Sequence, residues 1–163
     1  MITESEKRLH RVCFTGHRPE KLERSEAEIM KDLEKEIRRA LSDGMNVFIS
    51  GMARGTDIWA SQIVLKLKKQ EVQIKLICAC PYPGFEKGWN YAWQKQYRDI
   101  LAAADFVKYV CKSYGVGCFQ KRNEWMVNHS ARVIAVFNGK SGGTKNTIAF
   151  SKKAGVPVVL LGG

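Results

Sequence analysis

The sequence has few of the residues that build metal sites or disulfide frameworks. Its 163 residues include three histidines and five cysteines, and no two cysteines form a CxxC pair. Zinc sites need several such ligands at close spacing, and disulfide frameworks pair their cysteines. We therefore expect neither a metal nor a disulfide framework. Cys13, Cys78 and Cys80 fall in apolar runs, where a thiol acts as a small buried side chain, whereas Cys111 and Cys118 fall in an expected loop.

Long apolar runs and familiar nucleotide-binding patterns are also missing. No stretch approaches the roughly 20 apolar residues of a membrane-spanning helix. The first eight residues, MITESEKR, are charged and contain no apolar signal segment. We therefore expect a cytoplasmic protein without membrane contact. Neither GxGxxG nor GxxxxGK[ST] occurs, which disfavours ordinary NAD and ATP sites.

Acidic residues are outnumbered, with 16 Asp and Glu against 27 Lys and Arg, which gives a formal charge of +11. Such a surplus favours anionic partners, either nucleic acid or phosphorylated small molecules. Many of the basic residues lie on helix-like segments and form solvated faces, so charge alone does not choose between these partners.

Strand-like apolar runs alternate with amphipathic helical segments along the chain. The expected strands cover 12–15, 47–50, 74–80, 106–110, 133–137 and 156–161. The expected helices run from Ser25 to Asp43, from an N-cap near Asp57, and over 94–104, 119–130 and 144–154. This alternation predicts an α/β, Rossmann-like three-layer domain with a mostly parallel sheet of about six strands. We expect a single domain over 1–163, with its core at 11–161.

Glycine, arginine and small hydroxyl residues gather directly after the expected strands. Because parallel strands end at one edge of the sheet, these loops should meet there and bind a ligand. Glycine lets backbone amides approach an anion, and helix N-termini attract phosphate. The residues expected to contact the ligand are Gly16, His17, Arg18, Ser50, Gly51, Arg54, Gly55, Asp57, Pro81, Trp89, Arg122, Asn123, Asn138, Gly139, Gly142, Gly143 and Thr144.

Individual roles can be assigned within this set. Gly142, Gly143 and Thr144 would hold a phosphate, while Gly16 and Arg18 would hold a second anionic group or a ribose. The aromatic group after the third strand has two readings that stay open here. A base could stack on one of its rings, or the rings could pack a long loop onto the sheet. Its members are Tyr82, Phe85, Trp89, Tyr91, Trp93 and Tyr97.

Four segments resemble the YpsA-like branch of the SLOG superfamily. They are CFTGHRP at 13–19, SGMARGTD at 50–57, RN followed by WMV within 122–127, and GGT at 142–144. The resemblance spans about residues 11–161. It implies a binding or sensing domain for a small phosphate-bearing nucleotide derivative, similar to ADP-ribose, with a regulatory role in bacterial cell division or stress. No cofactor beyond such a ligand is expected, and self-association as a homo-oligomer is left open.

Two related families supply the alternatives. LOG-type enzymes cleave the glycosidic bond of a nucleoside monophosphate with an arginine and a glutamate. Arg122 matches the arginine and is the best catalytic candidate, but Thr147 occupies the glutamate position, with Asp57 or Glu124 as substitutes. Whether the chain is an enzyme therefore stays open. The DprA family shares the 50–57 loop, which implies binding of single-stranded DNA.

Overall fold

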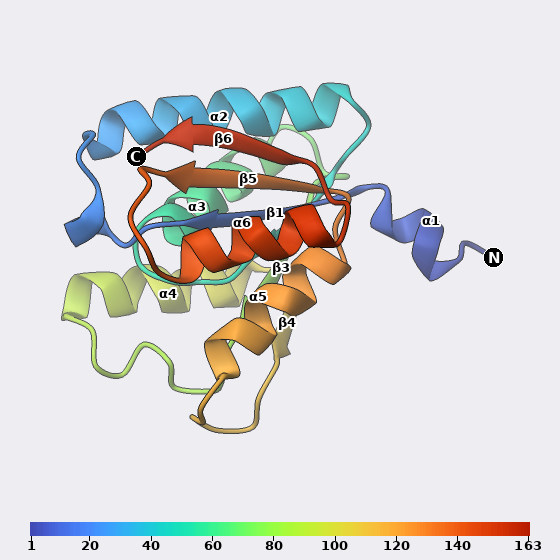
Figure 1. The fold of residues 1–163 in the computed structure, drawn as a ribbon. Helices are drawn as coiled ribbons and strands as arrows, with labels where there is room; N and C mark the ends of the chain where they lie inside the picture. The colour runs from blue at the N-terminus through green and yellow to red at the C-terminus, as the bar shows by residue number, and fades with distance from the viewer.

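The computed structural model describes residues 1–163 and contains one sheet of six parallel strands (Figure 1). The strands are β1 (Arg11–Gly16), β2 (Val47–Ser50), β3 (Lys75–Cys80), β4 (Phe106–Tyr109), β5 (Arg132–Phe137) and β6 (Val158–Gly162). Their order across the sheet is β4-β3-β2-β1-β5-β6. The chain therefore builds outward from β1 to β4 and then crosses back to add β5 and β6 on the other side of β1. The order reverses between β1 and β5, which is where open α/β sheets bind ligands.

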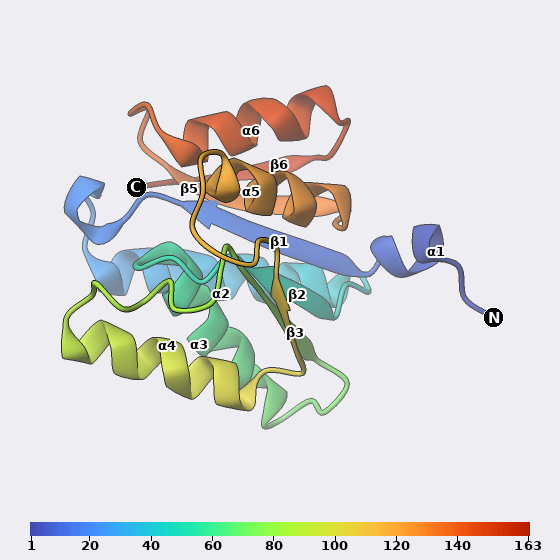
Figure 2. The same ribbon diagram turned by 90° about the horizontal axis from the view of Figure 1, so that it is seen from below.

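Helices cover both faces of the sheet, so the molecule has three layers (Figure 2). The helices are α1 (Glu4–Arg8), α2 (Glu26–Ser42), α3 (Thr56–Lys68), α4 (Tyr91–Ala103), α5 (Cys118–Asn128) and α6 (Gly143–Lys153), with a short 3-10 helix, η1 (Pro19–Lys21). Helices α2, α3 and α4 lie on one face, and α5 and α6 pack together on the other. Helix α1 extends beyond the amino end of β1 (Figure 1). No helix combines the length and the apolar composition that crossing a membrane would require.

The two faces of the sheet carry apolar cores of different size. Side chains alternate along β1, so Val12 and Phe14 enter a core of 22 buried residues under α2, α3 and α4. Cys13, between them, points to the other face and joins a core of 7 buried residues under α5 and α6. The sheet is thus buried on both faces, as a parallel sheet requires.

The observed architecture confirms the expected fold class, and the element boundaries differ by a few residues. Helix α4 begins at Tyr91, earlier than expected, because the Asn90 side chain accepts a hydrogen bond from the Trp93 amide at 3.0 Å. Strand β6 begins after Pro157 rather than at Val156. The expected N-cap at Asp57 is wrong: Gly55 is the N-cap of α3, and Asp57 is the second residue of the helix.

Candidate functional site

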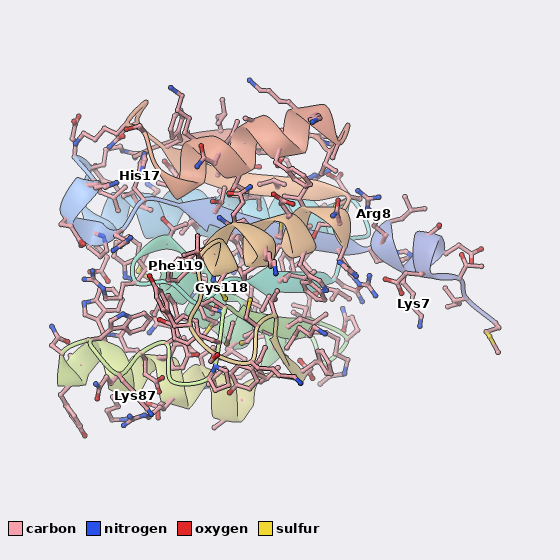
Figure 3. All side chains as sticks on the ribbon, turned by 60° about the horizontal axis from the view of Figure 1, so that its bottom comes forward. Lys7, Arg8, His17, Lys87, Cys118 and Phe119 are labelled. Atoms are coloured by element: carbon pink, nitrogen blue, oxygen red, sulfur yellow. The ribbon has the colours of Figure 1, made fainter.

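A cavity of about 290 Å³ opens at the carboxyl end of the sheet, where β1, β2, β3 and β5 end. The loops after these strands and the first turns of α3, α5 and α6 form its wall. His17 and Phe119 lie toward this end of the molecule in Figure 3, and Lys7 and Arg8 of α1 lie at the opposite end. The cavity therefore occupies the place that the strand order indicates.

The loop after β2 is bent back on itself to form one wall of the cavity. Ser50 begins the turn by accepting a hydrogen bond from the Met52 amide at 3.2 Å and donating one to the Asp57 carbonyl at 3.1 Å. Met52 has a φ of 63° and is the one non-glycine residue with positive φ. Such strained backbone is often found at functional sites. The turn places Ala53, Arg54 and Asp57 on the cavity wall.

Close approach between β1 and α3 requires glycine at the end of β1. A Cβ built on Gly16 would lie 2.1 Å from Oγ1 of the buried Thr56. Gly55, with a φ of 89°, packs in the same way against Pro19 and the carbonyl of His17. These two glycines let the loop after β1 and the start of α3 share one side of the cavity.

Asp57 and Arg122 are oppositely charged groups buried in the floor of the cavity. Their side chains flank Gly51, since a Cβ built there would lie 3.0 Å from both Asp57 Oδ2 and Arg122 Cζ. Arg122 Nη1 donates to the Gly51 carbonyl, and its Nε donates to Asn123 Oδ1 at 2.8 Å. Burial lowers the pKa of the Arg122 guanidinium, although the charge of Asp57 acts in the opposite direction.

The carboxyl group of Asp57 is only partly satisfied by the protein. Its Oδ2 accepts a hydrogen bond from the Ala53 amide at 3.1 Å, while its Oδ1 is buried and has no partner. Burial raises the pKa of Asp57 to about 6, and Arg122 and the Ala53 amide oppose this rise. A buried acceptor without a partner is costly, so a ligand that donates a hydrogen bond to Oδ1 would be stabilised here.

His17 presents a second unpartnered atom to the cavity. Its side chain is 3% exposed and stacks on Phe137 with ring centroids 5.4 Å apart, and its Nε2 has no hydrogen-bond partner. Burial lowers the pKa of His17, and the charges of Lys21 and Lys140 lower it further. The ring is therefore held neutral and can donate to or accept from a ligand.

Three further cations lie around the opening, and they differ in how the protein engages them. Arg54 forms an ion pair with Glu20 at 2.9 Å, and Lys21 Nζ donates to the Ser141 carbonyl at 3.5 Å. The exposed Arg18 side chain makes no hydrogen bond or ion pair with the protein. Arg18 is thus the cavity cation that is available to an anionic ligand without breaking an existing contact.

The helix α6 begins at the edge of the cavity with a glycine-rich turn. Gly142 is its N-cap, with a φ of 139°, and Gly143 and Thr144 line the cavity. The first amides of a helix attract phosphate. Thr147, which occupies the LOG glutamate position, does not reach the cavity, because its hydroxyl donates to the Gly143 carbonyl at 2.8 Å within the helix.

The aromatic residues divide between the core and the cavity. Phe85, Trp89 and Phe119 line the cavity, with Phe85 at 5.1 Å from Trp89 and 5.6 Å from Phe119 between ring centroids. Tyr97 is buried behind them, and Tyr91 is 75% exposed. The rings therefore pack the loop onto the sheet and also form an apolar wall of the cavity, while stacking of a base on them stays a prediction.

The structure brings together ten of the seventeen residues expected to contact the ligand. Those lining the cavity are Gly16, His17, Arg18, Arg54, Asp57, Trp89, Arg122, Asn123, Gly143 and Thr144. The others shape the surrounding turns without lining it: Ser50, Gly51, Gly55, Pro81, Asn138, Gly139 and Gly142. Lining residues outside that set are Phe14, Thr15, Lys21, Ala53, Phe85, Phe119 and Met126, of which Phe85 belongs to the aromatic group discussed above. Phe119 could have been found from its spacing, because it lies three residues before Arg122 on the expected helix and therefore on the same face.

Sequence comparisons identify relatives of the chain. The YpsA family model, described as the YspA SLOG family, matches residues 12–154. The SPbeta prophage-derived protein YoqJ of Bacillus subtilis is 36% identical over 118 residues, which are 65% of this chain and 69% of that protein. A UPF0398 protein of Halalkalibacterium halodurans is 30% identical over 151 residues, covering 87% of this chain and 80% of that protein.

Structural comparisons find the same fold in a larger protein. DNA processing protein A (DprA) from Streptococcus pneumoniae superposes with a TM-score of 0.69 at 22% identity over 95% of this chain. The chain spans about half, 51%, of that DprA structure. DprA from Helicobacter pylori, whose structure is described for its single-stranded DNA binding mode, gives a TM-score of 0.62 at 18% identity, covering 96% of this chain and 66% of that one.

Proposed function

The chain belongs to the YspA SLOG family, and we propose that it binds a small phosphate-bearing nucleotide derivative, similar to ADP-ribose, in the cavity at the carboxyl end of its sheet. The observation that carries this proposal is the convergence of polar groups that lack protein partners. Asp57 Oδ1 and His17 Nε2 are buried without hydrogen bonds, and Arg18 forms no ion pair, yet all three residues line one cavity. A ligand with hydroxyl groups and phosphate would satisfy all of them.

The chemistry of each wall suggests how such a ligand would be oriented. The first amides of α6 and Arg18 would hold phosphate, and the Asp57 carboxylate would accept hydrogen bonds from ribose hydroxyls. Phe85 and Trp89 would pack against the base or a second sugar. The volume of about 290 Å³ is at the lower end of the roughly 300–1,000 Å³ range of ligand sites, so one nucleoside phosphate would be enclosed and the rest would extend outward.

Binding of this kind suits a sensor. The ligand would report a nucleotide signal, in keeping with the regulatory role in cell division or stress that the family resemblance implies. The catalytic glutamate expected of a LOG-type hydrolase is Thr147 here, so binding without turnover is the first function to test.

A thermal-shift screen with ADP-ribose, NAD and AMP tests the proposal. We expect at least one ligand to raise the melting temperature of the wild-type protein. Arg18→Ala should lower the affinity for that ligand roughly tenfold or more, because a hydrogen bond to a charged group is worth about 1.5–3 kcal/mol. The melting temperature of the unliganded variant should stay unchanged. Arg122→Ala should lower both the ligand affinity and the unliganded melting temperature, because it removes the donor to the Gly51 carbonyl.

The matched control is Lys35→Ala, which removes an exposed cation on α2 that makes no ion pair and lies outside the cavity. This variant should match the wild type in both measurements. If none of the three ligands shifts the melting temperature at millimolar concentration, the proposal is wrong.

Glycosidic-bond hydrolysis is the second candidate, and the state of Asp57 favours it. A carboxyl group whose pKa is raised to about 6 can accept a proton from water near neutral pH, which is what a general base must do. The attacking water would form its bond to C1′ of the ribose as the bond to the base breaks, with Asp57 in place of the missing glutamate.

The pH dependence of base release from AMP, followed by chromatography, checks this second candidate. A general base works only when deprotonated, so the rate should be low below the pKa of Asp57 and rise as the pH passes through about 6. Asp57→Asn should abolish release, whereas Asp99→Asn on the exposed side of α4 should not change it. Release that persists in the Asp57→Asn variant would exclude this mechanism.

A further inference from the structure

Two cysteines lie at the ends of an exposed loop beside the cavity and converge on one backbone carbonyl. Cys111, just after β4, donates its amide to the Pro81 carbonyl at 2.9 Å. Cys118, the first residue of α5, donates its thiol to the same carbonyl at 3.1 Å. Both residues therefore pack against the Pro81 peptide group, which brings Cys111 and the Cys118 thiol close together. All five cysteines are free thiols in this structure.

The two thiols differ in their access to solvent. Cys118 is 1% exposed, whereas Cys111 is half-buried and can be reached from outside. Burial and the neighbouring Cys111 thiol together raise the pKa of the Cys118 thiol to about 11, while Arg122 and Lys121 act in the opposite direction.

The loop between them is exposed along its whole length. Residues 112–117 are all exposed, and nothing lies within 4 Å of a Cβ built on Gly115 or Gly117. The Cys118 end also carries part of the cavity wall. Phe119 follows it directly (Figure 3), and Arg122 and Asn123, which also line the cavity, lie one turn further along α5.

We propose that Cys111 and Cys118 are a redox-active pair that closes to a disulfide by exchange with a low-molecular-weight disulfide such as oxidised glutathione. The Cys111 thiolate attacks one sulfur of glutathione disulfide, which forms a mixed disulfide and releases one glutathione thiolate. The Cys118 thiolate then attacks the Cys111 sulfur and displaces the second glutathione. The protein loses two hydrogens, and glutathione disulfide is reduced to two thiols.

Closing the disulfide would change the cavity through α5. The Cys118 sulfur could no longer donate to the Pro81 carbonyl, so the constraint that positions the first turn of α5 would be replaced by a different one. Phe119 and Arg122 would move with that turn. The disulfide pairing does not depend on the proposed function. Its effect on ligand affinity rests on the proposed function.

Trypsin digestion without reductant tests the pairing, because cleavage after Lys108, Lys112 and Lys121 separates the two cysteines. After equilibration with glutathione disulfide, we expect the peptide 109–112 to be linked to the peptide 113–121, and dithiothreitol to release both. Cys118→Ser should trap glutathione on Cys111, whereas Cys111→Ser should leave the buried Cys118 unmodified. Cys13→Ala, which removes a buried thiol from the core under α5 and α6, is the matched control and should form the link as the wild type does.

Two results would overturn the pairing: no linked peptide at any ratio of reduced to oxidised glutathione, or a mixed disulfide on Cys111 that persists while Cys118 is intact. The effect on the cavity is measured separately, by titrating the ligand from the thermal-shift screen into the reduced and the oxidised protein. We expect about a tenfold difference in affinity, which is absent in Cys111→Ser. If the linked peptide forms but the reduced and oxidised proteins bind the ligand equally well, the disulfide stands and its effect on the cavity is rejected. If neither form binds a ligand, only the proposed function is rejected.

Discussion

At the scale of single residues, the contact between Gly16 and Thr56 fixes how β1 approaches α3. A side chain at position 16 would have to displace the hydroxyl of a threonine that is fully buried. That hydroxyl has no hydrogen-bond partner of its own, so its place is set by packing alone. The shape of this side of the cavity therefore depends on the absence of one methyl group.

Gly16→Ala tests this dependence. We expect the free energy of unfolding to fall by about 1–3 kcal/mol, the usual cost of inserting a group into a filled core, and ligand binding to weaken with it. Urea denaturation gives the first quantity. Gly88→Ala is the matched control, because a Cβ there meets nothing within 4 Å and the residue has no positive φ, so its stability should equal that of the wild type. Equal stabilities for both variants would mean that the close approach is unimportant.

Single residues were also the hardest to place from the sequence. The spacing of SGMARGTD suggests a helix capped by Asp57, because aspartate is a common N-cap. In the structure Gly55 takes that place, which turns the Asp57 side chain into the cavity. The helix therefore begins two residues earlier than expected, with Gly55 at a φ of 89°, and no pattern in the sequence reveals this.

At the scale of elements, α1 stands apart because it contributes nothing to the core. None of its residues is buried, and it is held by Arg8, which donates to the carbonyls of Ser130 at 2.9 Å and Val127 at 3.4 Å. An ion pair between Glu4 and Arg11 adds an exposed contact. The helix depends instead on its own capping box at Thr3 and Glu6.

We therefore expect removal of residues 1–7 to leave the fold and the cavity intact. The exposed ion pair is worth about 0–1 kcal/mol, so the melting temperature measured by circular dichroism should fall by only a few degrees. Ligand affinity should not change, because α1 lies at the end of the sheet opposite the cavity. Loss of the cooperative transition on truncation would show that α1 is part of the folding unit.

The longer elements were predictable because their apolar period is strong. Ile29, Leu33 and Ile37 repeat every four residues and are buried along α2. Ser25 caps this helix by accepting the Glu28 amide at 3.2 Å, and Gly44 follows it with a φ of 86°. The five residues of α1 have no apolar face, so no periodicity could reveal them.

At the scale of the whole molecule, the edge that holds the cavity followed from the parallel sheet, but its exact lining did not. All carboxyl ends of parallel strands lie on one edge, which is why Gly16, Arg54 and Thr144 meet although they are far apart in the chain. Which side of each loop faces inward depends on the strand order and on local turns. Ser50 and Gly51 therefore lie beneath the wall, and Lys21 joins it.

The net charge of +11 is also a property of the whole molecule, and it bears on the alternative of single-stranded DNA. The 69%-exposed Tyr114 lies 5.7 Å from Tyr82 and 6.4 Å from Phe119 between ring centroids, so aromatic rings continue outward from the cavity. Bases can stack on such rings while Lys and Arg neutralise the backbone.

If the chain binds single-stranded DNA, an oligothymidylate should bind with an affinity that falls steeply as salt increases, with a slope of about −0.7 per neutralised phosphate in a double-logarithmic plot. Fluorescence anisotropy measures this slope. Tyr114→Ala should lower the affinity for the oligonucleotide, since one stacked base is worth about 1–3 kcal/mol, and should not change the affinity for the small ligand. Phe106→Ala, an exposed aromatic on β4, is the control. Binding that is insensitive to salt would argue against this interaction.

The unequal apolar cores on the two faces of the sheet have a consequence for how a ligand enters. Helices α5 and α6 cover the smaller core, of 7 buried residues. Separating them from the sheet would therefore expose less apolar surface to water than separating α2, α3 and α4 from the core of 22 residues. The cavity is lined by residues of α3 on one side of the sheet and of α5 and α6 on the other. We therefore expect the α5–α6 side to open more readily than the α2–α4 side, and a ligand to enter the cavity from there.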